Sequence, residues 1–186
     1  MAAYFFRMKL STLAIVLGLG FAALQLFGVL QPARYGAALR RFPRSLVWGW
    51  VLTLLGTAGF LYNLRQEAIS DFAAYKPMML GGFGVLGVAT CIFVKDFLAV
   101  RGLAVVLLLL AKVLVDAARW SDTPWRLVIV VWAYGWIVAG MWFTVSPWRL
   151  RDLIEWSTAT VERTRMLSAV RLGFGLFVAG LGATVL

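Results

Sequence analysis

The sequence predicts an all-α, polytopic integral membrane protein of about six transmembrane helices, folded as a single domain over residues 1–186. Hydrophobic residues make up 62% of the chain and charged residues 14%, against about 45–50% and 25% in ordinary soluble domains. Apolar residues also run on for about 20 positions at a time, the helix length that crosses a bilayer core of roughly 30 Å. A soluble helix would carry polar residues along one face of such a stretch.

Six apolar segments of this kind follow one another, separated by short polar connections. All five prolines lie between the segments or at their edges, where a missing backbone N–H costs least. The third and fourth segments are nearly continuous, so residues 94–97 are predicted to form a tight turn or a helix break, and a count of five spans stays open. The segments are 10–30, 46–64, 78–94, 98–118, 125–145 and 167–186.

The first segment has two interpretations. Arg7 and Lys9 precede it, and small residues around Gly20 resemble the cleavage site of a secretory signal. The apolar run continues to Leu30, however, which is longer than the core of a typical signal. The segment is therefore interpreted as a retained transmembrane helix.

Residues 146–166, just before the last segment, are predicted to form an amphipathic helix that lies on the membrane surface. Leu150, Leu153 and Ile154 fall on one helical face, and charged residues fall mostly on the other. Trp148 suits the boundary with the lipid headgroups. Contact with the membrane surface is therefore expected to depend on Trp148, Leu153 and Ile154.

The connection at 31–45 resembles the segment that begins at 146. Each starts with a proline two residues before an arginine, and each joins two consecutive spans. These shared features raise the hypothesis of a duplicated pair of helices.

The formal net charge is +10, with 18 basic and 8 acidic residues. In a soluble protein this excess would suggest nucleic acid, but here the basic residues lie in the connections, so we expect anionic lipid headgroups as partners and no nucleic acid. Connections one, three and five carry 11 basic residues, against 6 on the opposite side. Because basic loops stay in the cytoplasm, these three connections are predicted to face it. The 11 residues are Arg34, Arg40, Arg41, Arg44, Lys95, Arg101, Arg149, Arg151, Arg163, Arg165 and Arg171.

Lys112 and Asp116 are the strongest polar feature inside a span. They stand four residues apart in the fourth segment and so share one helix face. Charges inside a span often mark a path for ions or protons. Lys112 is only about six residues, roughly 9 Å, from the end of its segment, and its long stem can reach the interface. An ion-pair cluster with Arg119 at the membrane edge is the preferred interpretation; ion movement and contact with a partner subunit are the alternatives.

Two helix faces are candidates for contact with another helix or with a ligand. Gly175, Ala179 and Ala183 recur every four residues in the last segment, and small side chains let helix backbones approach closely in lipid. Whether that neighbour is internal or another protein stays open. Trp132 and Trp136 share a face deep in the fifth segment. Packing against another helix is the preferred interpretation of this face, and binding of a lipid tail, quinone or pigment is the alternative.

The residue types that most catalysis and cofactor binding need are missing. The chain has no histidine, which excludes histidine-ligated haem or zinc and Ser-His-Asp triads. A single cysteine, Cys91, forms neither an internal disulfide nor a cysteine metal cluster. Residues 82–87 match the letters of the dinucleotide fingerprint, but in a membrane segment rather than at a strand–helix junction. No cofactor, metal or catalytic residue is therefore predicted, and an enzymatic role is not indicated.

The preferred functional interpretation is a noncatalytic integral membrane subunit or scaffold of a larger membrane complex. Its partners would be other membrane protein subunits or further copies of the chain. The alternative is a small transporter or channel for an ion, a lipid or a small apolar solute. An excess of arginine over lysine, with abundant alanine, glycine and leucine, suggests a bacterial protein, located in the cytoplasmic (inner) membrane.

Overall fold

The computed structural model describes residues 9–67 and 73–186. These residues form α-helices and short 3-10 helices, and no strand occurs among them. Six of the helices are long and apolar enough to cross a membrane, which confirms the predicted fold class and number of spans. Arg7, on which the signal-sequence interpretation depends, lies outside the described residues.

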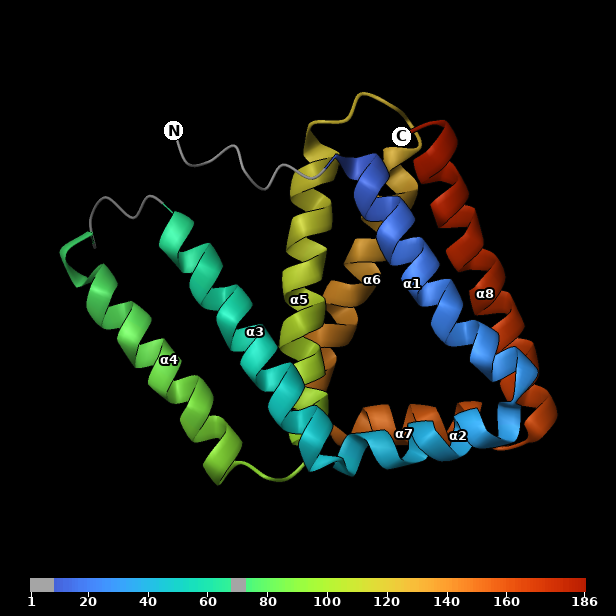
Figure 1. Cartoon of the computed structure of the whole chain (residues 1–186), viewed down its shortest axis with the longest axis horizontal. Helices are drawn as coiled ribbons and strands as arrows, with labels where there is room; N and C mark the ends of the chain where they lie inside the picture. Colours follow the sequence, from blue (N-terminus) through green and yellow to red (C-terminus); the bar gives the residue numbers. More distant parts are fainter. Residues whose placement is uncertain (1–8, 68–72) are drawn as a thin grey trace.

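The helices follow the predicted segments closely (Figure 1). The six spans are α1 (Leu10–Leu30), α3 (Leu46–Gln66), α4 (Lys76–Phe93), α5 (Leu98–Arg119), α6 (Arg126–Val145) and α8 (Val161–Thr184). Two helices of 10 residues each, α2 (Pro32–Arg41) and α7 (Trp148–Ser157), stand between α1 and α3 and between α6 and α8. Two 3-10 turns, η1 (Phe42–Arg44) and η2 (Ala73–Tyr75), precede α3 and α4.

Prolines, a capping side chain and one left-handed residue set several helix ends. Pro32 and Pro77 occupy the first turns of α2 and α4, where the missing N–H removes no helical hydrogen bond. Ser45 caps α3, because its hydroxyl accepts from the Trp48 backbone N–H at 3.4 Å. Phe97 adopts a φ of 53° between α4 and α5. This left-handed residue turns the chain back sharply and separates the two spans, as the tight-turn prediction required.

The segment 146–166 is not one helix, and this prediction was wrong. α7 ends at Ser157, and α8 begins at Val161 and continues for 24 residues. Threonines between the two helices cause the break. The Thr158 hydroxyl donates back to a carbonyl of α7 at 2.7 Å, and Thr160, with extended backbone, caps the first turn of α8. The last span therefore begins earlier than the sequence predicts.

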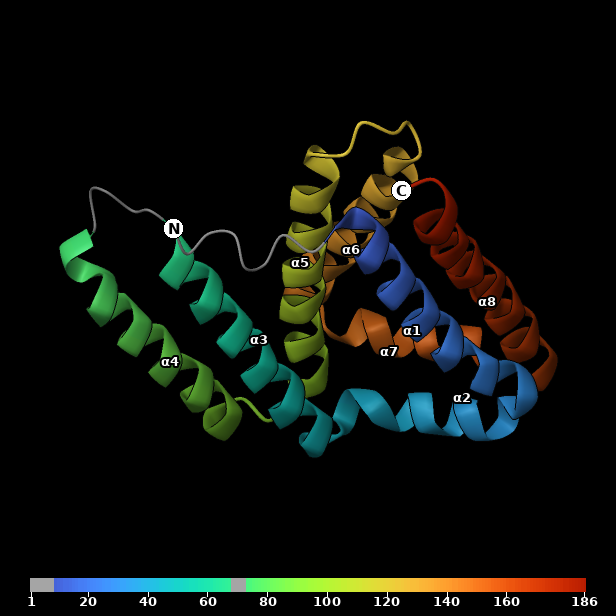
Figure 2. The same cartoon turned by 45° about the horizontal axis from the view of Figure 1, so that its top comes forward.

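The helices form two groups that meet at one end (Figures 1 and 2). α1 and α8 pack together as one group, and α3, α5 and α6 form the other, with α4 on the outer side of α3. At one end the groups share an apolar core that includes Ala14, Leu114, Ala133 and Val178. At the other end α2 and α7 lie side by side across both groups.

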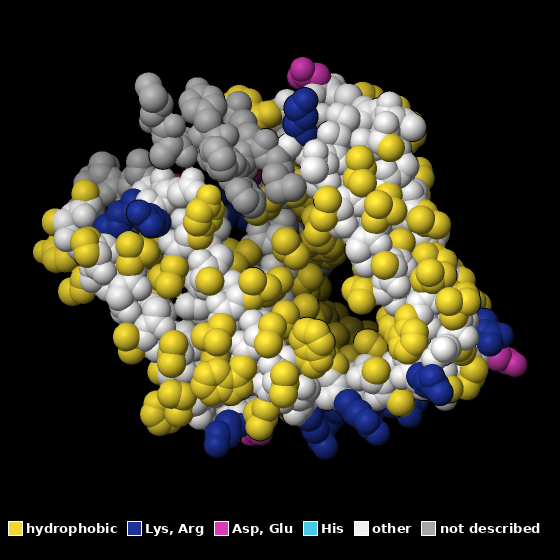
Figure 3. Space-filling view, in the orientation of Figure 1, with side chains coloured by type: hydrophobic (Ala, Val, Ile, Leu, Met, Phe, Trp, Pro, Cys, Tyr) yellow, Lys and Arg dark blue, Asp and Glu magenta, His cyan; other side chains and the backbone are white. Residues whose placement is uncertain are grey.

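The space between the two groups is open toward α2 and α7. Figure 3 shows a deep opening between α5 and α1, bordered by hydrophobic side chains. Lysine and arginine side chains gather along the edge of the molecule that α2 forms in this view. We call this the basic edge, and it comprises α2, η1, α7, the turn at 94–97 and the first turn of α8. Four of its exposed residues are Arg34, Arg41, Arg44 and Arg149.

Candidate functional site

The small-residue face of α8 lies against α1, so its neighbour is internal. Gly175 and Ala179 are buried there, and a Cβ atom added to Gly18 of α1 would lie only 2.7 Å from the Ala179 nitrogen. Ala183 is exposed, and Gly182 takes its place in the contact. The reason is angular: each four-residue step drifts about 40° around the helix, whereas the seven-residue step from Gly175 to Gly182 nearly returns to the same face.

α1 supplies the other half of this contact, which the sequence interpretation missed. Ala14, Gly18 and Ala22 recur every four residues and are all buried. A Cβ atom added to Gly175 would lie 2.9 Å from the Gly18 oxygen and 3.0 Å from the Ala22 nitrogen. The spacing of small residues in α1 is the signal that could have identified these positions.

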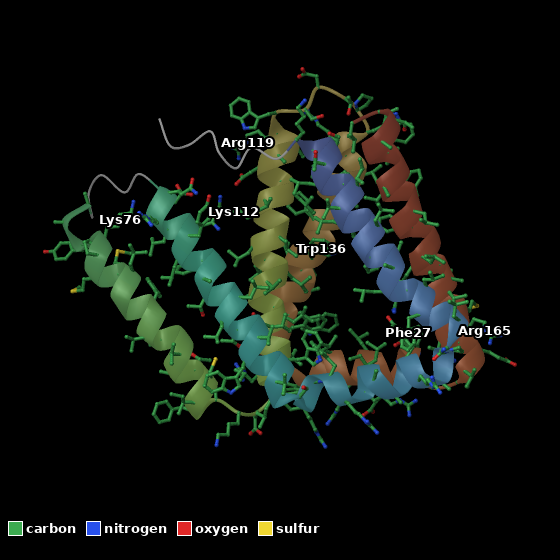
Figure 4. The ribbon with its side chains drawn as sticks, in the orientation of Figure 1. Phe27, Lys76, Lys112, Arg119, Trp136 and Arg165 are labelled. Atoms are coloured by element: carbon green, nitrogen blue, oxygen red, sulfur yellow. The ribbon has the colours of Figure 1, made fainter. Side chains whose placement is uncertain are left out.

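Lys112 pairs with two carboxylates near the end of α5. Its Nζ lies 2.7 Å from Asp116 and 3.8 Å from Glu67, the residue that follows α3, and the side chains of Lys112, Asp116 and Glu67 are 46%, 50% and 62% exposed, respectively. Such exposed pairs stabilise a fold by only about 0–1 kcal/mol each. They line a pocket of about 760 Å³ together with Lys9 and Arg119, at the end of α5 where Figure 4 labels Lys112 and Arg119. Among the described residues the third member of the ion-pair cluster is Glu67 rather than Arg119, and the position of the cluster at the membrane edge stays a prediction.

Trp132 is the centre of an aromatic group that joins three helices. Its ring meets Trp136 edge-on, with centroids 4.5 Å apart. It also contacts Phe21 of α1 at 5.9 Å and Phe174 of α8 at 5.5 Å. Trp132, Trp136 (labelled in Figure 4) and Phe174 border an open apolar groove of about 560 Å³ on α6. The contacts support packing as the main role of these tryptophans, and the groove could accept an acyl chain.

The three residues expected to anchor α7 to the membrane differ in exposure. Trp148 and Leu153 are exposed, whereas Ile154 is 8% exposed and packs inside the protein. Ile154 is therefore unavailable to lipid, because the side of α7 that carries it faces the rest of the molecule. Surface contact through Trp148 and Leu153, joined by the exposed Trp156, stays a prediction.

Arg40 fastens α2 to the turn between α7 and α8. Its Nε donates to the Thr158 hydroxyl at 2.8 Å, and a second guanidinium N–H donates to the Thr158 carbonyl. On α7 itself, Arg151 donates to Asp152 at 2.9 Å, and this carboxylate raises the pKa of the guanidinium. The contact of Arg40 with Thr158 joins α2 to the end of α7, so the two short helices form one layer. Arg40 and Thr158 are 118 residues apart in the chain, so no local pattern points to their contact.

A polar group interrupts the α1–α8 contact toward the basic edge. The Tyr35 hydroxyl of α2 donates to Gln25 Oε1 of α1 at 3.3 Å. Gln25 is 5% exposed and Ser168 of α8 is 1% exposed. Arg171, one turn after Ser168, is partly buried. In the charge count Arg171 belongs to the fifth connection because it lies close to the predicted start of the last span at residue 167, whereas α8 begins at Val161.

In the described part of the chain, no three potential metal-ligating side chains come together. Cys91 is buried. Comparison with known proteins found no matching family model, no matching curated protein and no matching solved structure. The described residues include six helices that are long and apolar enough to cross a membrane.

Proposed function

We propose that the chain is a noncatalytic subunit or scaffold of a complex in the bacterial cytoplasmic membrane. The isolation of α4 is the observation that supports this proposal. Among the long helices of the described residues, α4 packs closely only against α3, and it forms the outer edge of the molecule in Figures 1 and 2. Because helices in lipid are joined by close packing rather than by a hydrophobic force, a second protein or a second copy would supply the contact that α4 lacks.

The side of α4 that faces away from α3 permits close approach of another helix. A Cβ atom added to Gly87 would meet Thr57 of α3, whereas no atom of the described residues lies within 4 Å of one added to Gly81 or Gly82. Glycine destabilises a helix by roughly 0.5–1 kcal/mol relative to alanine. In membrane helices, glycine is enriched where another backbone comes near. Gly81 and Gly82 are therefore the positions at which we expect the partner.

Native mass spectrometry of the protein, extracted from its own membrane in mild detergent, tests this proposal. We expect a complex with another membrane protein or with further copies of the chain. Gly82→Leu should reduce recovery of the complex, because the added side chain keeps the partner helix away. Gly180→Leu is the matched control, since Gly180 is an equally open position on α8. A lone monomer in every preparation of the unmodified protein would overturn the proposal.

We also infer that the basic edge faces the cytoplasm and contacts anionic headgroups. The arginines exposed on α2 and η1 (Arg34, Arg41 and Arg44) and Arg149 of α7 support this orientation. Each basic residue close to an anionic membrane surface contributes about 1 kcal/mol of attraction. The basic edge would therefore hold the protein against the negatively charged leaflet.

A small transporter or channel is the second candidate function. The opening between the two helix groups, bordered by hydrophobic side chains in Figure 3, favours a lipid or small apolar solute, and the pocket around Lys112 favours an ion. Proton and potassium flux into liposomes, followed with ion-sensitive dyes, tests the ionic version. A flux that Lys112→Ala and Asp116→Ala both leave unchanged would exclude these residues from the path.

A further inference from the structure

Arg171 is a charged residue within the membrane-spanning helix α8, six residues after Arg165. α8 begins at Val161, so Arg171 stands about ten residues, or roughly 15 Å of helix, from its start. Ser168 lies three residues earlier and Gly175 four residues later, and both are buried against α1. Residues at these spacings share one helix face, and Arg171 is itself partly buried. Its side chain is therefore directed toward the inside of the molecule.

The inner face of α8 at this level borders the opening between the two helix groups. One turn further along, Phe174 contacts Trp132 of α6, and beyond it Val178 belongs to the shared core. Toward the basic edge the groups diverge, and Figure 3 shows the opening there. Arg171 stands three residues before Phe174 and so shares a face of α8 with it, from which we infer that Arg171 faces the opening on the side nearer the basic edge.

Arg171 has no carboxylate partner and no hydrogen-bond acceptor within residues 9–67 and 73–186. Three other arginines near the basic edge have partners, since Arg40 donates to Thr158, Arg151 to Asp152 and Arg163 to Trp156. Arg41, Arg44 and Arg149 are exposed, whereas Arg171 is partly buried. A guanidinium carries five N–H donors, and an unpaired charge inside a membrane span is costly. An anion from outside the chain would remove this cost.

The surroundings of Arg171 are the polar part of an otherwise apolar helix contact. Gly28 of α1 lies against Ser168, and Ala22 lies against Gly175. Gln25 is midway between Gly28 and Ala22, so the antiparallel register brings it level with Arg171. The Gln25 carbonyl is engaged by Tyr35. The Gln25 amide nitrogen is a further hydrogen-bond donor at the level of Arg171.

We propose that Arg171 binds the phosphate group of an anionic lipid whose acyl chains occupy the opening. A guanidinium matches two phosphate oxygens with two parallel hydrogen bonds. The hydrophobic side chains that border the opening suit acyl chains, as Figure 3 shows. The basic edge concentrates anionic lipid beside it. A free phosphate ion shares the headgroup chemistry but gains nothing from the apolar walls.

Binding of phosphatidylglycerol and phosphatidylcholine with the same acyl chains, measured by native mass spectrometry of the detergent-purified protein, tests this site. Phosphatidylglycerol should bind more tightly. Arg171→Gln should weaken its binding about tenfold, as the loss of charge-assisted hydrogen bonds implies, and should weaken phosphatidylcholine binding less, because the choline group offsets the charge of that lipid's phosphate. Arg165→Gln is the control, because Arg165 is exposed at the outer edge of α8 in Figure 4. This control should leave the binding of both lipids nearly unchanged.

Two further arms identify the bound group. Arg171→Lys keeps the positive charge but not the two parallel hydrogen bonds, so it should bind phosphatidylglycerol with intermediate affinity. This variant also tests the site if Arg171→Gln does not fold. Displacement of phosphatidylglycerol by inorganic phosphate would support the phosphate site but assign it to a free anion. Equal binding of the two lipids, or equal losses in Arg171→Gln and Arg165→Gln, would overturn the proposal. None of these outcomes depends on a partner subunit.

Discussion

Side-chain size decides how closely two membrane helices approach, because lipid supplies no hydrophobic force between them. At Gly18 and Gly175 the backbones of α1 and α8 come so near that an added Cβ atom would lie under 3.0 Å from a backbone atom of the opposite helix. Phe27 and Tyr35 extend this group toward the basic edge, with ring centroids 6.1 Å apart, where Figure 4 labels Phe27. The α1–α8 group therefore depends on residues that have almost no side chain.

Ala179→Leu should destabilise the protein, because the larger side chain would overlap the α1 backbone at Gly18. Overpacking of this kind costs about 1–3 kcal/mol. Ala183→Leu, the same change one turn later at an exposed position, should be nearly neutral. Thermal unfolding of both variants in one detergent measures the difference. Equal midpoints for the two variants would show that Ala179 does not face α1.

Lys112→Met should change stability by less than about 1 kcal/mol, because the ion pairs it removes are exposed and screened. Chemical denaturation in detergent checks this value, with Asp116→Asn as the variant that removes the other partner of the 2.7 Å pair. A loss of several kcal/mol in either variant would mean that the pair is shielded inside the membrane, and the interpretation as an edge cluster would fail.

Sequence spacing identifies residues only as far as helix geometry stays regular. A local repeat of small residues correctly predicts that Gly175 and Ala179 lie in a helix contact. Ala183, from the same repeat, is exposed, and Ile154, predicted to face the membrane, is buried. The sequence places Arg171 only a few residues after the predicted start of the last span at residue 167 and so underestimates its distance from the start of α8 at Val161. That start is set by the capping hydroxyl of Thr160, a weaker signal than a run of apolar residues.

At the scale of elements, α2 and α7 share one layer because side chains distant in sequence connect them. Arg40→Leu should lower stability by about 1–2 kcal/mol, since it removes charge-assisted hydrogen bonds to the buried Thr158. Arg41→Leu, at the exposed neighbouring position, is the matched control. Unfolding midpoints that fall equally in the two variants would point to loss of headgroup contact rather than of this connection.

The predicted surface position of α7 can be measured at Leu153. Leu153→Cys labelled with an environment-sensitive fluorophore should emit at shorter wavelength in lipid nanodiscs, because the side chain would sit among headgroups and acyl chains. Glu155→Cys is the control on the same helix, and the native Cys91 is buried and so little labelled. Identical emission from the two positions would remove the membrane-surface assignment.

The sequence predicts the spans well, because each must match the thickness of a bilayer with a long apolar run. The tight turn between α4 and α5 was also predictable, since Lys95 and Asp96 interrupt two such runs. The break at 158–160 was not, because threonine is tolerated in helices and ends them only where its hydroxyl finds a backbone partner. The layer of α2 and α7 depends on long-range contacts and has no local signature.

For the whole molecule, the two helix groups are packed together at one end and diverge toward the other, where α2 and α7 lie across both groups. The apolar core fixes the two helix groups together near the C-terminal end of α8, and the basic edge closes the opposite end. The hypothesis of a duplicated helix pair gains support from this arrangement, because α1–α2–α3 and α6–α7–α8 share the order span, 10-residue helix, span. The two units also place their short helices side by side.

The central claim is that six helices cross the membrane and leave α2 and α7 on one side of it. Cysteine accessibility in intact cells tests this most directly, with a membrane-impermeant maleimide applied to Ala37→Cys in α2, Ala159→Cys after α7 and Asp122→Cys between α5 and α6. All three positions are exposed. We expect labelling of Asp122→Cys alone, with Ala37→Cys and Ala159→Cys labelled only after the membrane is opened. Labelling of Asp122→Cys and Ala37→Cys from the same side would contradict the account.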